Sequence, residues 1–495
     1  MSSERFAFPR AELRRRTLRG AAVTAAFLVL IDGLVIAQGL VVTRVLGPAT
    51  IGLYGIVSTT VITLVALKRI GIDEAFVAQS EADQEAEFQY AFTLDLAASA
   101  IIALCICASA PIIALVYGDD RLVALTLSLA YLPIAFALQA PLWIFFRRMD
   151  YARQRSLQAI QPVVSFVVTV TLVLATSLGV WSIVIGQVVS YVIAVGCGWL
   201  VSPYRPRLRW DPEVADRYLR FSTPIFVTVV ATLVIAQGQV LAFKLHGGLA
   251  AAGFITLAVT LTRYIDRADQ IVTATLYPAV CAIQGQALAL QELFVKANRA
   301  TLLWVMPFGA AVVLFAPDLV TFVLGPKWRP AVILLQGLAV AALLAQLGFN
   351  WFSFYRAAGR TGPTAVEALV QAGGFLALAI PGLIVDGSDG FVAGRIAAVL
   401  LTLVVRSRYI RALLPGVRYR SMLGPSVGCV TAATVAVLAV RLAAWGGRRS
   451  LGQAIGECAL FLAVYGAAAL WRERPLVDEL RGALRSADAP GAGLA

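Results

Sequence analysis

A group of ionisable side chains lies inside a long apolar stretch of the sequence, where charge is costly and usually functional. The group consists of two arginines and two aspartates: Arg263, Asp266, Arg267 and Asp269. Apolar runs flank it on both sides, over residues 250–261 and 271–283. Because residues three and four positions apart share one face of a helix, both arginines and the first aspartate are expected to line up, with Tyr264 beside them.

The planar guanidinium groups of Arg263 and Arg267 suit the paired oxygens of a phosphate. Two alternatives stay open: the arginines and aspartates satisfy one another, or the group lies at the cytoplasmic interface of a membrane. Lys68 and Arg69 occupy the corresponding depth of another apolar run, and they either join the same basic site or extend to the membrane surface. The expected substrate-binding residues are these four basic side chains and Tyr264.

A single carboxylate, Asp32, interrupts the first apolar run near its middle. A carboxylate at that depth either binds a coupling proton or Na⁺, or is capped by a neighbouring polar side chain and serves packing. Asp266 and Asp269 are the other candidate ion-coupling carboxylates. The sequence does not decide between a coupling role and a packing role.

The composition defines the environment of these residues. The chain has 495 residues, of which 60% are hydrophobic and 14% charged, against about 25% charged in a soluble domain. Mean hydropathy is +0.82. These values exclude a soluble enzyme, a disordered chain, a coiled coil and a secreted disulfide scaffold. They predict an all-α polytopic membrane protein.

Apolar runs long enough to cross a bilayer recur along the chain, and we count about fourteen. The predicted spans are 20–43, 51–72, 88–117, 122–146, 157–178, 180–201, 221–245, 250–283, 300–325, 331–355, 363–385, 390–405, 421–444 and 451–471. Basic residues fall mostly in alternate connections, which predicts that both termini are cytoplasmic. The net charge of +13 is therefore explained by topology, and no nucleic-acid partner is expected.

The sequence offers little for metal, redox or covalent chemistry. Its cysteines lie in apolar runs, its single histidine is His246, and no spacing suggests a metal or another cofactor. The predicted loops are short, all under about 20 residues, and leave no room for an extramembrane catalytic domain. We therefore expect a transporter rather than an enzyme.

The chain contains an internal repeat. The string LVIAQG occurs at residues 34–39 and again at 233–238, and WIFFRR at 143–148 parallels WFSFYR at 351–356. The repeat predicts two six-helix bundles in the same orientation, a plan common among secondary transporters. The expected division is listed from the N-terminus: a basic segment 1–19, bundles 20–205 and 206–412, two further spans 413–472, and a cytoplasmic tail 473–495.

Two strings carry a family resemblance: TRVLGPATIGLYG at residues 43–55 and LGPKWRPA at 324–331. With the predicted span count, they make the chain resemble Wzx-type oligosaccharide flippases of the multidrug/oligosaccharidyl-lipid/polysaccharide exporter superfamily. The resemblance implies alternating-access flipping of a polyprenyl-pyrophosphate-linked oligosaccharide across the bacterial cytoplasmic membrane, for exopolysaccharide, O-antigen or capsule synthesis. Expected partners are the lipid-linked oligosaccharide, membrane lipids, a polysaccharide polymerase and a chain-length regulator.

Three alternatives remain at this stage. A lipid II flippase has the same span count and a cationic site. A cation-coupled multidrug exporter of the same superfamily usually has twelve spans and a more acidic site. A membrane glycosyltransferase or polymerase is disfavoured by the short loops, since the isolated Asp119–Asp120 pair does not make a catalytic constellation.

Overall fold

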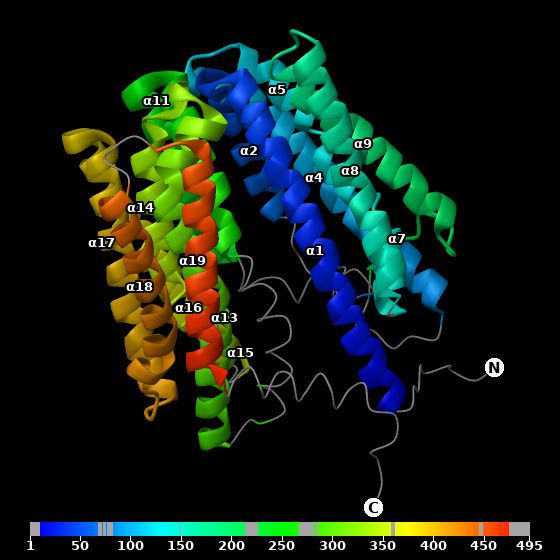
Figure 1. The fold of residues 1–495 in the computed structure, drawn as a ribbon. Helices are drawn as coiled ribbons and strands as arrows, with labels where there is room; N and C mark the ends of the chain where they lie inside the picture. Colours follow the sequence, from blue (N-terminus) through cyan, green and yellow to red (C-terminus); the bar gives the residue numbers. More distant parts are fainter. Residues whose placement is uncertain are drawn as a thin grey trace, which may run out of the picture. The chain divides into compact units, whose positions relative to one another are not determined.

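The computed structural model describes residues 10–67, 72, 76, 83–148, 150–212, 226–266, 280, 283, 286–357, 362–444 and 449–474. Over these residues the chain forms helices joined by turns, with no strand, as the apolar composition predicts (Figure 1). In hydrocarbon each backbone donor and acceptor needs a partner within the protein, and a helix provides those partners locally. The predicted all-α membrane fold is confirmed.

The described residues divide into two compact units, separated between Val229 and Val230. The first unit contains α1 (Arg10–Leu46), α2 (Pro48–Leu67), α4 (Gln84–Tyr117), α5 (Arg121–Leu129), α6 (Leu132–Ala137), α7 (Pro141–Arg147), α8 (Tyr151–Ala175) and α9 (Trp181–Val201). In this unit α8 packs against both α1 and α9.

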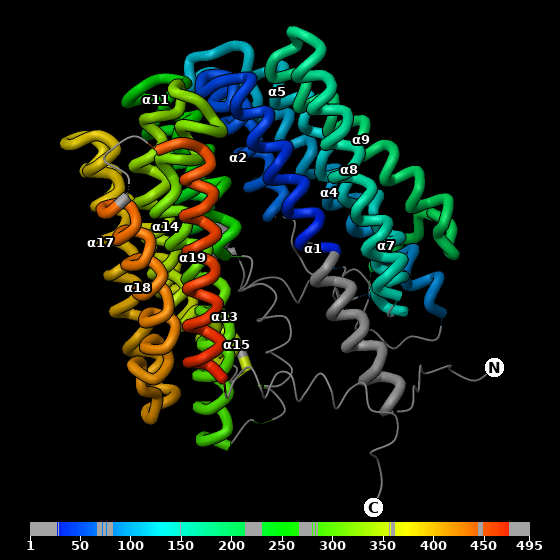
Figure 2. Tube along the Cα trace, viewed as in Figure 1, coloured from blue at the N-terminus to red at the C-terminus, as the bar shows by residue number. Residues whose placement is uncertain are grey.

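The second unit begins within α11 (Phe226–Thr262) and is followed along the chain in Figure 2. Its further elements are η2 (Arg263–Asp266), α13 (Ala287–Asp318), η3 (Leu319–Leu324), η4 (Pro326–Trp328), α14 (Ala331–Ala345), α15 (Trp351–Ala357), α16 (Gly362–Gly374), η5 (Phe375–Ala379), α17 (Ile380–Leu413), α18 (Tyr419–Ala444) and α19 (Leu451–Arg472). The finer expected division of the chain into segments stays a prediction.

Eleven helical segments of the described chain are long and apolar enough to cross a membrane. Two of them contain a break in helical geometry, at Gly247–Gly248 in α11 and at Asp386–Gly387 in α17. The shorter apolar helix α14 adds to this set. The exact number of fourteen spans stays a prediction.

The break in α17 brings its first arm back against its second. Gly387 has φ 58°, a left-handed conformation that glycine adopts at little cost. A Cβ atom on Gly382 would collide with the carbonyl oxygen of Gly390, and one on Gly394 would collide with that of Leu378. Glycine at these positions therefore lets the two arms approach to backbone contact.

Some spans are interrupted rather than continuous. Turns separate α5, α6 and α7 in the first unit, and the turn at residues 346–350 separates α14 from α15 in the second. Arg406 on α17 donates to the carbonyl oxygens of Ala345 and Leu347, the latter at 2.8 Å, and pairs with Glu367 at 2.6 Å. This one guanidinium therefore supplies partners to the backbone that the break in the helix leaves open.

Charged contacts at two places along α13 fix the last two helices, α18 and α19, to it. Near the C-terminal end of α13, Asp318 accepts from Arg449 at 2.9 Å, and Glu457 accepts from Arg449 and Arg441, each at 2.7 Å. In the N-terminal half of α13, Arg299 pairs with the buried carboxylate of Glu473. Apolar side chains of α13, α18 and α19 pack between these contacts.

We predict that Glu457→Ala lowers the stability of the folded protein by about 1.5–3 kcal/mol, because it removes one of the two carboxylates that pair with the half-buried guanidinium groups of Arg441 and Arg449. The side chain of Glu457 is only 2% exposed. Thermal unfolding of the purified protein in detergent measures the change. As a control, Glu292→Ala removes the exposed Lys296–Glu292 pair and should leave the unfolding curve where it is. Equal curves for the two variants would contradict the prediction.

Candidate functional site

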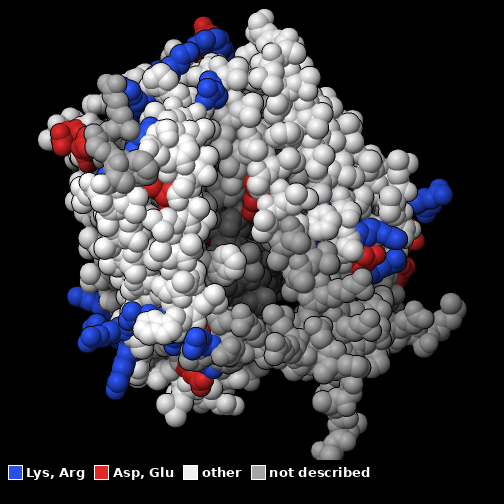
Figure 3. Space-filling view, in the orientation of Figure 1, with Lys and Arg blue, Asp and Glu red and all other residues white. Residues whose placement is uncertain are grey.

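Charged side chains lie mainly at the ends of the helices in the second unit. Figure 3 shows an almost uncharged middle zone over α17 and α18, with Lys and Arg gathered at their lower end. The exposed arginines around the turn between these helices are Arg408, Arg411, Arg418 and Arg420. A zone of this kind is expected where helices face lipid, and the assignment of the basic end to the cytoplasmic side stays a prediction. Charges inside the middle zone are exceptions that need a reason.

The clearest exception is Arg395 on α17. Its guanidinium lies over the ring of Phe375, with Cζ 5.9 Å from the ring centroid, and its Nη1 atom is buried. Within the described part of the chain, Nη1 makes no hydrogen bond. The carboxylate of Asp266 lies within electrostatic range. A buried guanidinium with a donor left over is poised to bind an anionic group.

Asp266 is held by an amide from another helix. Nε2 of Gln346, the residue that ends α14, donates to Oδ1 of Asp266 at 2.7 Å. Ile265 beside it packs into a small buried cluster with Val305 and Ala339, which fixes the turn η2. We call these side chains the Arg395–Asp266 cluster: Arg395, Asp266, Gln346 and Phe375.

Each member of the Arg395–Asp266 cluster stands at or beside an irregularity in a helix. Asp266 lies in the 3₁₀ turn after α11, and Gln346 lies at the break after α14. Phe375 begins the π-helical turn η5, and Arg395 follows Gly394, whose lack of a side chain lets α17 contact the backbone of η5. π-turns of this kind occur often at functional sites. The irregular turns thus bring a charged pair and an amide together inside an apolar unit.

The structure separates the residues that the sequence grouped. Arg263 is exposed, while Tyr264 and Asp266 are half-buried. The helix expected to continue over residues 250–283 ends at Thr262 and becomes the 3₁₀ turn η2. The remaining predicted members of the site lie outside the described residues: Arg267, Asp269, Lys68 and Arg69. Their roles stay predictions.

Asp32 lies in α1 and is half-buried. Its unit contains a set of amide and hydroxyl contacts between helices, which we call the amide seam. Gln38 donates to Ser165 at 3.2 Å, and Gln187 donates to the hydroxyl of Tyr54 at 2.7 Å. A third pair, Gln161 with Ser190, joins α8 to α9 at 3.3 Å. The seam links α1, α2, α8 and α9 through neutral polar groups.

Sequence reasoning missed Arg395, which it would place near a span end. The signal was present in the glycines at 390 and 394, four residues apart, which predict close helix packing beside the arginine. No group of three or more His, Cys, Asp or Glu side chains in the described residues could hold a metal ion. What the described side chains can do is hold an anion and form hydrogen bonds to neutral polar groups.

The fold matches that of known membrane exporters. An inward-facing multidrug resistance MATE family transporter of the MOP superfamily aligns with a TM-score of 0.63 at 16% identity, covering 80% of this chain and 99% of that one. The lipid II flippase MurJ in an inward closed conformation aligns with a TM-score of 0.66 at 12% identity, covering 92% and 99%. At these identities the likeness shows the fold alone: this chain shares the helical fold of these two membrane proteins.

The sequence profile of the polysaccharide biosynthesis protein family matches residues 41–333, and the chain belongs to that family. A relative is the succinoglycan biosynthesis transport protein ExoT of Rhizobium meliloti (strain 1021), 23% identical over 444 residues, which cover 81% of this chain and 88% of the relative. The resemblance to Wzx-type flippases is thereby confirmed.

We predict that Arg395→Met abolishes export while leaving the thermal unfolding midpoint unchanged or higher. An apolar side chain of similar length removes a guanidinium whose buried Nη1 donor has no hydrogen-bond partner among the described residues, and burying such an unpaired donor itself costs stability. Export is measured in cells, and unfolding on the purified variant.

The matched control is Arg406→Met, which removes a guanidinium already bonded to Ala345, Leu347 and Glu367. It should lower the unfolding midpoint clearly. If Arg395→Met destabilises the protein as much as this control does, Arg395 serves the fold rather than a ligand.

Proposed function

We propose that this protein flips a polyprenyl-pyrophosphate-linked oligosaccharide across the bacterial cytoplasmic membrane by alternating access. The family match supports a role in polysaccharide biosynthesis, and the observation that carries the substrate class is the buried guanidinium of Arg395 with its unused donor. A pyrophosphate brings several anionic oxygens into a low-dielectric site, where a charge-assisted hydrogen bond is strong. The proposal includes the predicted orientation, with both termini in the cytoplasm.

In this proposal the anionic headgroup binds at the Arg395–Asp266 cluster, and the basic residues predicted from sequence contribute to the same binding step. Those residues are Arg263, Arg267, Lys68 and Arg69, with Tyr264 beside them. Asp266 offsets the charge of Arg395 when no headgroup is bound, and Gln346 holds that carboxylate in place. An anionic headgroup that replaces Asp266 as the partner of Arg395 can bind reversibly, as transport requires.

The transport step makes and breaks no covalent bond. The protein has to lower the free-energy cost of moving a polar headgroup through hydrocarbon, and it does so by replacing water with fixed side-chain groups. Only a differential affinity between two conformations can bias the direction of movement. Ion binding at Asp32, Asp266 or Asp269, or consumption of the product by a polymerase acting with a chain-length regulator, supplies that bias.

We predict that replacing both Arg263 and Arg267 with alanine abolishes flipping of the lipid-linked oligosaccharide, because the headgroup loses two guanidinium partners. Purified protein in liposomes is supplied with fluorescent undecaprenyl-pyrophosphate-linked oligosaccharide, and protection from an impermeant quencher reports flipping. The single variant Arg408→Ala, in the exposed basic turn between α17 and α18, is the control and should retain activity. Normal flipping by the double variant would remove these two arginines from the binding step.

We predict that Asp32→Asn flattens the dependence of flipping on a pH or Na⁺ gradient, because the amide cannot take up the coupling ion. The same liposomes are assayed with each gradient imposed in turn. Asp119→Asn, which changes the carboxylate that pairs with the exposed Arg121, is the matched control. An unaltered gradient response in Asp32→Asn would assign the carboxylate to packing.

A second candidate function is lipid II flipping, which the structural likeness to MurJ favours. The liposome assay separates the two when lipid II and the longer lipid-linked oligosaccharide are compared at equal concentration. Faster flipping of lipid II would replace the polysaccharide substrate in the proposal. Export of organic cations, as in multidrug exporters, is tested with a fluorescent cation in the same vesicles.

A further inference from the structure

A basic segment follows α9 in the first unit, over residues 203–212, with the sequence PYRPRLRWDP. Three arginines alternate in it with three apolar residues, and all six side chains are exposed: Arg205, Pro206, Arg207, Leu208, Arg209 and Trp210. Leu208 is 71% exposed and Trp210 is 60% exposed. Exposed tryptophan and leucine between cationic side chains are typical of segments that lie in a membrane interface.

The backbone of the basic segment is fixed to α4. Nε2 of Gln89 donates to the carbonyl oxygen of Arg205 at 3.3 Å, and the backbone N–H of Arg209 donates to Oγ1 of Thr93 at 2.9 Å. Gln89 and Thr93 stand one turn apart on α4, so the segment runs along that helix. Pro206 lacks a backbone donor and favours an extended conformation at Arg205. The chain here forms neither helix nor strand, and its arginines are presented from a backbone that α4 holds.

Aromatic side chains hold the start of the basic segment. The ring of Tyr204 lies 5.7 Å from that of Phe88, and Cζ of Arg148 lies 5.4 Å from the centroid of the Tyr204 ring. Trp199, near the end of α9, packs against Phe88 and Phe92 with ring centroids 6.2 and 5.4 Å apart. Tryptophan and tyrosine concentrate where a membrane protein meets the headgroup layer. The aromatic contacts therefore indicate the same depth as the composition of the segment.

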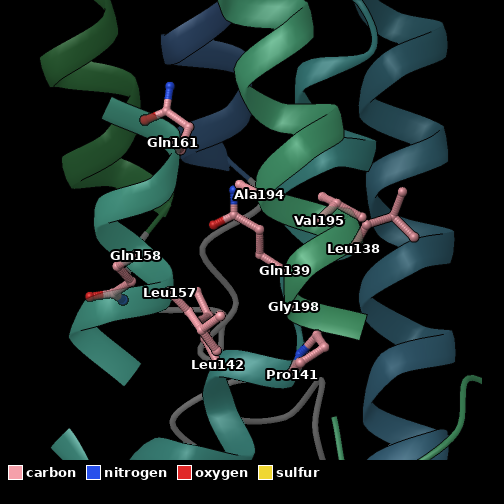
Figure 4. Close-up of a pocket in the computed structure, with 10 residues that line it drawn as sticks. All are labelled: Leu138, Gln139, Pro141, Leu142, Leu157, Gln158, Gln161, Ala194, Val195 and Gly198. Atoms are coloured by element: carbon pink, nitrogen blue, oxygen red, sulfur yellow. The ribbon is translucent and has the colours of Figure 1, made fainter. Parts of the chain in front are cut away.

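A hollow at this end of the unit is too small for a ligand. It lies between the α6–α7 turn, α8 and α9, is lined in part by Gly198 beside Trp199, and has a volume of about 10 Å³ (Figure 4). That volume holds about one water molecule. The arginines of the basic segment are instead exposed on the outside of the unit, where a partner can reach them.

The length of α4 gives the depth of the basic segment in the membrane. The exposed Arg121 beyond Tyr117, with its partner Asp119, marks the membrane surface at the C-terminal end of that helix. At about 1.5 Å per residue, Thr93 lies about 36 Å along the helix axis from Tyr117. The hydrocarbon core is about 30 Å thick, and the headgroup layers extend it to about 40–45 Å. The contact between Thr93 and Arg209 therefore lies in the headgroup layer.

The charge of the basic segment is not matched by the protein. Within the described part of the chain, its three arginines make no ion pair, and the segment contains one carboxylate, that of Asp211. Two acidic side chains at the same end of the unit cap helices instead. Asp83 accepts from the backbone N–H of Ala86 at 3.0 Å, and Asp150 accepts from that of Arg153 at 3.2 Å. The segment therefore attracts an anion from outside the protein.

We propose that the basic segment binds the headgroups of anionic phospholipids in the leaflet at this end of the first unit. The planar fork of arginine matches the oxygens of a lipid phosphate. Leu208 and Trp210 match the apolar layer just below the headgroups, which a soluble anion does not have. The bound lipid fixes the depth of this end of the unit, and this role does not depend on which lipid-linked glycan the protein flips.

The test compares an anionic and a zwitterionic lipid. Full-length protein in a non-ionic detergent is titrated with phosphatidylglycerol and with phosphatidylcholine, each labelled on its tail, and fluorescence anisotropy gives the Kd. We expect wild-type protein to bind phosphatidylglycerol more tightly. Replacing Arg205, Arg207 and Arg209 together with glutamine should weaken that binding by about tenfold or more, because each arginine at a membrane surface adds to the attraction for anionic lipid. Binding of phosphatidylcholine should not change.

The matched control makes the same change of charge in the exposed turn between α17 and α18, by replacing Arg408, Arg418 and Arg420 with glutamine. It should bind phosphatidylglycerol as wild type does. Both variants should keep the wild-type thermal unfolding midpoint, because the replaced side chains are exposed. Lysine at the three positions of the basic segment keeps the charge and should restore most of the binding. Equal weakening in the segment variant and the control, or no weakening in the segment variant, would show that the segment is not the lipid site.

Two competitors test other partners of the basic segment. Undecaprenyl pyrophosphate that displaces labelled phosphatidylglycerol at a much lower concentration than unlabelled phosphatidylglycerol does would assign the segment to the transported lipid. Polyglutamate that does the same would assign it to an acidic protein. Either result overturns the proposal, and weaker competition by both supports it. Flipping in liposomes is measured separately, so the proposed function stands or fails independently of this result.

Discussion

The constraint on which the structure depends is the cost of an unpaired polar group in hydrocarbon. Helices satisfy their own backbone, and wherever a helix is interrupted a side chain must provide the missing partner. Arg406 does this at the break after α14 by donating to two carbonyl oxygens of the freed backbone. Within a continuous helix a hydroxyl finds its own partner, as Thr402 does by donating to the carbonyl oxygen of Ala398 in α17. The Arg395–Asp266 cluster likewise stands at irregular backbone, at η2, at the end of α14 and at η5.

Composition and hydropathy were sufficient to predict the fold class, because burial in lipid imposes a strong compositional demand. The strings around residues 43–55 and 324–331 were sufficient for the family, since they hold glycine and proline at the turns between spans. Hydropathy was less informative about span ends. The predicted span 390–405 stopped before Arg406, yet α17 continues to Leu413, because Arg406 is paired internally and belongs to the helix.

The site was harder to predict because hydropathy does not show which charged side chains are paired within the protein. Hydropathy alone places Arg395 as a charge near a span end, whereas the structure shows a half-buried side chain over Phe375, with its Nη1 atom buried and Asp266 within electrostatic range. That arrangement depends on contacts between residues more than 100 positions apart, and it requires a reversal at Asp386–Gly387 that periodicity does not reveal. Of the predicted group, Asp266 enters the cluster, whereas Arg263 is exposed. The Arg395–Asp266 cluster presents guanidinium and carboxylate, whereas the amide seam presents amides and hydroxyls.

The attachment of α18 and α19 to α13 has a consequence for how the chain is made. Arg299 and Asp318 enter the bilayer with α13, but their partners Glu473, Arg449 and Arg441 are synthesised later. Arg299 waits for a carboxylate 174 residues downstream, which is about 10–35 s at about 5–20 residues per second. During that interval α13 carries unneutralised charge. The nascent chain therefore has to be sheltered by the insertion machinery, and a ribosome that stalls before residue 449 leaves a helix that quality control can recognise.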